Sequence, residues 1–126
     1  MVRLFLLIQA ILFAGFGIYV FIDAPALAVT LGVPDMPGSG LYEIRSNYGG
    51  VNLGIGLFCL AAVIRPALER YALVFVAVFT GSYAMGRVLS LPYEGDPTAN
   101  FIAFGCYEAA MAVFATLLLR RLDKAL

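Results

Sequence analysis

The chain has 126 residues, of which 63% are hydrophobic and 13% are charged, and its formal net charge is zero. A soluble domain is closer to half apolar and a quarter charged, and a chain this short could not hide so much apolar side chain from water. The composition therefore excludes a soluble globular domain and predicts one domain in a lipid bilayer, with membrane lipids as partners and no nucleic acid.

Four apolar stretches follow one another along the chain, at residues 4–22, 41–64, 71–91 and 99–119. At a rise of about 1.5 Å per residue, each is long enough to cross a hydrocarbon core of about 30 Å as a helix. The alternation typical of strands is missing, so the sequence predicts an all-α, integral membrane four-helix bundle. The first stretch is longer than the apolar core of a signal peptide, and we interpret it as a true span.

The connections between these stretches carry turn and capping residues. Residues 23–40 contain prolines and glycines, and the segment APALAVTLG within them is long enough for a short interfacial helix. Pro66 lacks the amide that a continuing helix would need, so it separates the second and third spans. Between the third and fourth spans, Asp96 is expected as the N-cap of the last helix, with Pro97 at its first position.

The charges outside the spans predict an orientation. The charged residues of the first and third connections are all acidic. The basic residues outside the spans lie at the N-terminus, in the second connection and in the C-terminal tail. Positive residues are retained in the cytoplasm, so both termini are expected to face inward. The basic residues that give this signal are Arg3, Arg65, Arg70, Arg120, Arg121 and Lys124.

Several polar side chains fall inside the spans, toward their outer ends in this orientation. Asn52 and Glu108 are expected at similar depths, with Arg87 slightly above them. A charge in mid-membrane costs at least a few kcal/mol, so these groups should turn inward and pair. The sequence predicts an outer-leaflet polar pocket centred on Arg87 and Glu108. Its ligand-binding residues are expected to be Arg45, Tyr48, Asn52, Tyr83, Arg87 and Glu108, of which the first three share a helix face with Gly49 and Gly56.

Structural interpretations of the same residues stay open. An Arg–Glu pair can simply hold two helices together, and Arg45 and Arg87 are close enough to the interface to extend toward water. Small residues four apart allow close helix packing within the bundle, or form the seam of a homo-oligomer. Such pairs are Gly50 and Gly54, Ser82 and Gly86, and Gly105 and Ala109.

The chemistry of metal and cofactor sites is poorly represented. The chain has no histidine, and two cysteines alone cannot make a zinc or iron–sulfur site. Cys59 and Cys106 are expected at opposite depths, beyond disulfide reach. We therefore expect no cofactor, no metal site and no catalytic residue.

Several motifs follow one another along nearly the whole chain. They are the string LYEIRSNYGGVNLGIGLF, then RPALER, then MGRVLSL, and a glutamate in the fourth span. With these motifs the chain resembles an uncharacterised family of small bacterial four-helix membrane proteins, the domain of unknown function 4345. The resemblance implies four spans, a multi-pass protein of the bacterial inner (plasma) membrane and importance for Arg45, Arg87 and Glu108. It implies no reaction.

Three functions compete for this sequence. The first is a non-catalytic module that binds a lipid or small amphiphile, or an accessory subunit of a larger membrane complex. The second is an oligomeric small transporter or channel subunit, since four spans without a detectable repeat make a lone transporter implausible. The third, ranked last, is an intramembrane enzyme that uses Glu108 as an acid or base, because no nucleophile with an adjacent base is found.

Overall fold

A computed structural model describes residues 1–124 of the chain, which divides into two units, Met1–Glu69 and Arg70–Leu126. Helices account for the regular structure of the described residues. Four helical runs are long and apolar enough to cross a membrane, which confirms the all-α class and the four spans. These runs are Val2–Ile22, Gly38–Ile64, Pro66–Tyr93 and Ala99–Asp123. The orientation of the termini stays a prediction.

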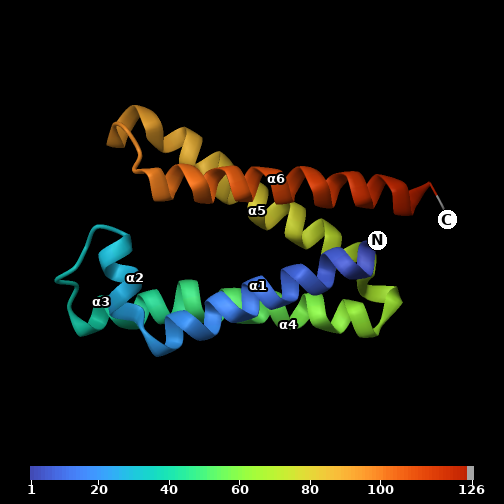
Figure 1. Ribbon diagram of the computed structural model, residues 1–126, viewed down its shortest axis with the longest axis horizontal. Coiled ribbons are helices and arrows are strands. Elements are labelled where there is room, and N and C mark those ends of the chain that lie inside the picture. Colours follow the sequence, from blue (N-terminus) through green and yellow to red (C-terminus); the bar gives the residue numbers. More distant parts are fainter. Residues whose placement is uncertain (125–126) are drawn as a thin grey trace. The chain divides into compact units, whose positions relative to one another are not determined.

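The first unit is built on two long antiparallel helices. Helix α1 (Val2–Ile22) lies alongside α4 (Val51–Ile64), and the two run in opposite directions (Figure 1). Two short helices, α2 (Ala24–Thr30) and α3 (Gly38–Ile44), fill the connection between them. A short 3-10 helix, η2 (Pro66–Leu68), follows α4, as expected of a proline at this point.

The second span is not the uniform α-helix that its composition predicts. Between α3 and α4 the backbone forms a π-helix, η1 (Arg45–Gly50), in which the amide of Val51 donates to the carbonyl of Ser46, five residues earlier. A π-helix is rare and is frequently found at functional sites.

Glycines bring the backbones of α1 and α4 into direct contact. A Cβ on Gly56 would lie 2.5 Å from the amide nitrogen of Ala14, and one on Gly17 would lie 2.7 Å from that of Leu53. Gly49 lies against the ring of Phe21. Gly49 and Gly56, which lie on the predicted stripe, therefore belong to a packing face of this span. Nothing lies within 4 Å of a Cβ on Gly54, so close packing against α1 is not found at that residue, and a homo-oligomer seam through Gly50 and Gly54 stays a prediction.

The connection after α1 folds back as the predicted short helix. Asp23 ends α1 and caps α2, with its Oδ1 accepting a hydrogen bond of 3.1 Å from the amide of Ala26. Gly32, with φ of +81°, ends α2 in a left-handed conformation that glycine adopts without strain. Apolar residues of α1, α2 and α3 then form one buried cluster, which comprises Val20, Ala24, Leu27, Ala28 and Ile44.

The second unit is a pair of long helices, α5 (Glu69–Glu94) and α6 (Ala99–Asp123) (Figure 1). Two expected boundaries were wrong. Helix α5 continues through Pro92 to Glu94; the lost amide donor and the ring of a proline disfavour a helix interior, but Pro92 lies only two residues from the helix end. Helix α6 begins after Thr98 rather than after Asp96, since the connection offers two residues of the N-cap type and the later one is used.

Large apolar side chains point outward from all four long helices. Leu4 and Ile11 of α1 are 63% and 64% exposed, and Val78 of α5 and Val113 of α6 are similarly exposed. In water such a surface would be unstable, whereas lipid tails solvate it. The outward surface and the four apolar runs together identify a small multi-pass membrane protein.

Candidate functional site

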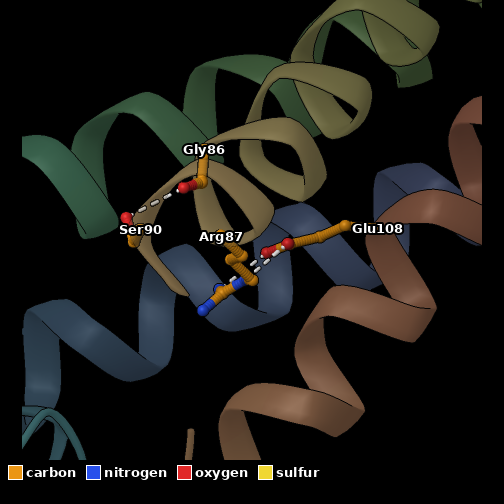
Figure 2. Close-up of polar contacts among 4 residues, drawn as sticks. All are labelled: Gly86, Arg87, Ser90 and Glu108. Carbon is orange, nitrogen blue, oxygen red and sulfur yellow. Dashed lines mark hydrogen bonds and ion pairs between the residues drawn. The ribbon is translucent and has the colours of Figure 1, made fainter. Parts of the chain in front are cut away.

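The second unit contains an ion pair inside its membrane-spanning helices. Arg87 of α5 reaches across to Glu108 of α6 (Figure 2), with Nε donating to Oε2 at 2.6 Å and Nη2 donating to Oε1 at 2.8 Å. Two parallel N–H···O bonds of this kind are the strongest geometry available to an arginine and a carboxylate. The predicted pairing of these two residues is confirmed.

The path of the Arg87 side chain is set by one face of α6. Phe101, Phe104, Gly105 and Glu108 are spaced by three or four residues and therefore line one side of that helix. The guanidinium carbon lies 5.8 Å from the ring centre of Phe101 and 5.7 Å from that of Phe104. Both distances lie within the range of cation–π attraction.

Gly105 leaves room for this crossing. A Cβ at that position would lie 3.3 Å from Cδ of Arg87, tighter than an ordinary contact. The sequence predicts Gly105 as a site of close helix packing. In the structure its missing side chain instead leaves room for the side chain of Arg87. In α5, Gly86, which the spacing of small residues pairs with Ser82, has no atom within 4 Å of a Cβ, and its carbonyl accepts a hydrogen bond from Ser90 (Figure 2).

The pair is only partly shielded. The side chain of Arg87 is 32% exposed, whereas that of Glu108 is 13% exposed. Inside hydrocarbon a lone charge of either sign is costly. The two paired hydrogen bonds between Arg87 and Glu108, called the fork below, neutralise both charges at once. The arrangement can therefore hold two helices together while part of the Arg87 side chain stays accessible.

Tyr83, four residues before Arg87 on α5, packs against its own helix. Its ring centre lies 4.9 Å from that of Phe79, with the planes tilted by 57°. Such tilted aromatic pairs contribute beyond their buried area. The spacing of four residues places Tyr83 and Arg87 on the same side of α5.

In the first unit, the predicted site residues bond to nearby backbone. Arg45 donates from Nε to the carbonyl of Phe21 at 3.3 Å, in the last turn of α1, where a cation meets the negative end of the helix. Asn52 is buried and donates from Nδ2 to the carbonyl of Tyr48 at 2.7 Å. Tyr48 itself packs against the buried cluster of α1, α2 and α3.

These contacts favour structural roles for the residues of the first unit. Arg45 satisfies a carbonyl at a helix end, and Asn52 satisfies a carbonyl of the π-helix, so each solves a local hydrogen-bonding problem. Arg45, Tyr48 and Asn52 belong to one unit, while Tyr83, Arg87 and Glu108 belong to the other. The convergence of all six on one pocket stays a prediction.

Sequence reasoning missed the two phenylalanines as neighbours of the guanidinium. The signal was available, because Phe101, Phe104 and Gly105 lie seven, four and three residues before Glu108. Once Glu108 is taken as the partner of Arg87, that spacing indicates which side chains the arginine must pass. Pairing and helix periodicity together would have identified the whole arrangement.

Two further ion pairs lie at helix ends. Nε of Arg3 is 2.8 Å from Oε1 of Glu69 in the first unit, and Nε of Arg70 is 3.0 Å from Oδ1 of Asp123 in the second. Both cysteines are free thiols, as expected. Among residues 1–124, no group of three or more Cys, Asp or Glu side chains is arranged to hold a metal ion.

A comparison with family models gives one match, over residues 1–119, and its description is a domain of unknown function (DUF4345). The match covers the first three spans and most of the fourth, including both members of the Arg87–Glu108 pair. No curated protein matches the chain significantly, and neither does any solved structure.

Proposed function

The chain belongs to the family of DUF4345, a domain of unknown function, and we propose that it is a non-catalytic membrane protein that binds a lipid or small amphiphile. The recognised group is an anionic phosphate or carboxylate, and the binding residue is Arg87. We place the site in the outer leaflet of a bacterial inner membrane, with both termini in the cytoplasm, because the basic residues outside the spans follow that pattern.

One observation carries this proposal, the partly exposed side chain of Arg87 inside a membrane-spanning helix. A purely structural clamp gains most when both charges are fully shielded, whereas a third of this side chain stays accessible. Ionisable groups inside spans commonly mark ligand paths. The rings of Phe101 and Phe104 beside the guanidinium supply an apolar surface for the chain of an amphiphile.

Glu108 has a second role in this proposal. Its carboxylate occupies two N–H groups of Arg87 and resembles the carboxylate or phosphate of a ligand. An incoming anion therefore competes with Glu108 for the same guanidinium. A carboxylate engaged in this way suits anion exchange at Arg87 better than proton transfer to a substrate, so we place the enzyme interpretation last.

The proposal is tested by titrating the full chain with dodecyl phosphate in dodecyl maltoside micelles, with binding followed by calorimetry. About 0.3 M salt screens the exposed charges at the helix ends. We expect saturable binding that R87Q abolishes. We expect E108Q to bind several-fold more tightly, because the competing carboxylate is gone, and R87K to bind more weakly, because lysine has no fork.

The matched control is R3Q, which removes another exposed, ion-paired guanidinium and should leave binding unchanged. Circular dichroism establishes that each variant is folded. Binding to R87Q with the affinity of the unaltered chain would contradict the proposal, as would weaker binding to E108Q. The same titration on R45Q tests the predicted membership of Arg45, since binding should weaken only if Arg45 also contacts the ligand.

A further inference from the structure

A cluster of basic side chains lies at the end of the second unit where α5 begins and α6 ends. We propose that this basic end binds the phosphate headgroups of anionic phospholipids. The basic end consists of Arg70, Arg120, Arg121 and Lys124, all of which are exposed. It is separate from Arg87, which lies 17 positions beyond Arg70 on α5 and 33 before Arg120.

An ion pair assembles this cluster from the two helices. Arg70, in the first turn of α5, is bonded at 3.0 Å to Asp123, in the last turn of α6. The bond brings Arg70 to the end of α6, where the other three cations follow one another within five residues. Both partners stay about half exposed, with 53% and 42% of their side chains accessible, so the pair remains at the surface.

The charge of the basic end is strongly one-sided. By residue type, Arg70 and residues 120–124 carry four cations and one carboxylate, that of Asp123, and the neighbouring carboxylate of Glu69 is bonded to Arg3. The last carbonyls of α6 carry partial negative charge, which stabilises basic side chains in its final turn. At the other end of this unit, the connection between α5 and α6 carries Asp96 and no basic residue.

The position of the cluster fits a membrane surface. The cations immediately follow the apolar part of α6 and immediately precede that of α5, so they lie where hydrocarbon meets headgroups. Guanidinium groups bind phosphate oxygens through paired N–H donors, and basic clusters directly beside a span attract anionic lipid. A zwitterionic headgroup offers the same phosphate but no net charge. Discrimination is therefore expected to come from net charge.

The test is native mass spectrometry of the full chain in dodecyl maltoside micelles that contain equal amounts of phosphatidylglycerol and phosphatidylcholine. We expect the unaltered chain to retain phosphatidylglycerol preferentially, and less so as ammonium acetate rises from about 0.05 to 0.5 M, because salt screens exposed charges. We expect R120Q/R121Q/K124Q to weaken phosphatidylglycerol binding by up to about 100-fold, at roughly fivefold per cation.

Two further variants separate the contribution of charge at the basic end from that of the Arg87 site. R120K/R121K preserves the charge and should preserve the preference for phosphatidylglycerol. R87Q removes the other proposed lipid site, so it should keep the part of the preference that R120Q/R121Q/K124Q loses, and a failure of the Arg87 site and a failure of the basic end are told apart. Retention of phosphatidylglycerol and phosphatidylcholine in equal amounts by the unaltered chain would overturn the inference. An unchanged preference in a folded R120Q/R121Q/K124Q variant would overturn it too.

Discussion

The two units hold their helices together in different ways. In the first unit, α1 and α4 meet through backbone, at Gly17 and Gly56, with no side chain between them. In the second unit, α5 and α6 are joined by charged side chains, Arg87 with Glu108 and Arg70 with Asp123. Lipid provides no hydrophobic drive between helices, so close packing and polar bonds are the two means available, and the two units differ in which of them joins the middle parts of their long helices.

The polar residues differ in the same way. In the first unit, Arg45 and Asn52 bond to backbone carbonyls of helix ends and of the π-helix. In the second unit, Arg87 and Glu108 bond to each other across two helices. A side chain that donates to a nearby backbone carbonyl is held in place by that bond. A side chain that is paired with another side chain can exchange it for a different partner. The difference explains why we assign ligand binding to Arg87 rather than to Arg45.

The largest expected effect comes from adding a methyl group to the backbone contact of the first unit. G56A would place a Cβ 2.5 Å from the amide nitrogen of Ala14, and α1 and α4 would have to separate. We expect a loss of about 3 kcal/mol in the free energy of unfolding, the upper part of the range for overpacking. The measurement is unfolding in mixed micelles with sodium dodecyl sulfate, followed by circular dichroism.

The matched control lies two residues earlier on the same helix. At Gly54 nothing lies within 4 Å of a Cβ, so G54A should leave the unfolding free energy unchanged or raise it by up to about 1 kcal/mol, the helix preference of alanine over glycine. Equal losses in G56A and G54A would remove the basis for a specific backbone contact.

The next effect concerns the ion pair of the second unit. E108Q replaces a carboxylate that accepts two charged hydrogen bonds, and it leaves the guanidinium of Arg87 with a neutral partner inside a span. We expect the unfolding free energy to fall by about 2 kcal/mol, within the range for hydrogen bonds to charged groups. Unchanged stability in the same unfolding assay would argue that the fork contributes nothing to holding α5 and α6 together.

A smaller effect is expected where Arg87 crosses α6. In G105A the new Cβ would lie 3.3 Å from Cδ of Arg87, and the flexible side chain can shift by a few tenths of an ångström. We expect a loss below about 1 kcal/mol in stability, from slight strain, together with weaker binding of dodecyl phosphate. G81A is the control, since its Cβ would make an ordinary contact of 3.6 Å with Ala112. Identical behaviour of the two variants would contradict the role given to Gly105.

The smallest effect is expected at the exposed ion pair. D123N removes the partner of Arg70 at a site where both side chains are well exposed, and exposed pairs of this kind contribute at most about 1 kcal/mol. We expect a change in unfolding free energy close to the error of the measurement. A loss of unfolding free energy as large as that of E108Q would contradict this expectation. It would mean that the exposed ion pair stabilises the unit as much as the shielded one.

Composition and the cost of buried charge were enough to predict part of this molecule. Four spans follow from apolar stretches of sufficient length. The pairing of Arg87 with Glu108 follows because neither charge is tolerated alone in lipid. The short helix at α2 follows from a run of helix-compatible residues between turn signals. These features depend on side-chain type and spacing, which the sequence displays directly.

Other features depend on backbone geometry, which side-chain patterns do not reveal. The π-helix at Arg45–Gly50 has no signature in the spacing of apolar residues, and the spacing of small residues gave Gly54 as a packing residue although nothing lies within 4 Å of a Cβ there. The acceptor for Arg45 is the carbonyl of Phe21, and every residue carries a carbonyl. The sequence therefore showed that Arg45 needs a hydrogen-bond acceptor. It could point to a carboxylate side chain as that acceptor, but not to one particular backbone carbonyl.

The most direct test of the difference between the units is a double-mutant cycle on Arg87 and Glu108, with unfolding free energies measured for R87Q, E108Q and R87Q/E108Q. If the fork joins α5 and α6, the double variant should lose less than the sum of the single variants, with a coupling energy above about 1 kcal/mol. Losses that add to within about 0.3 kcal/mol would show that the two side chains act independently, and would contradict both the clamp and the anion site built on it.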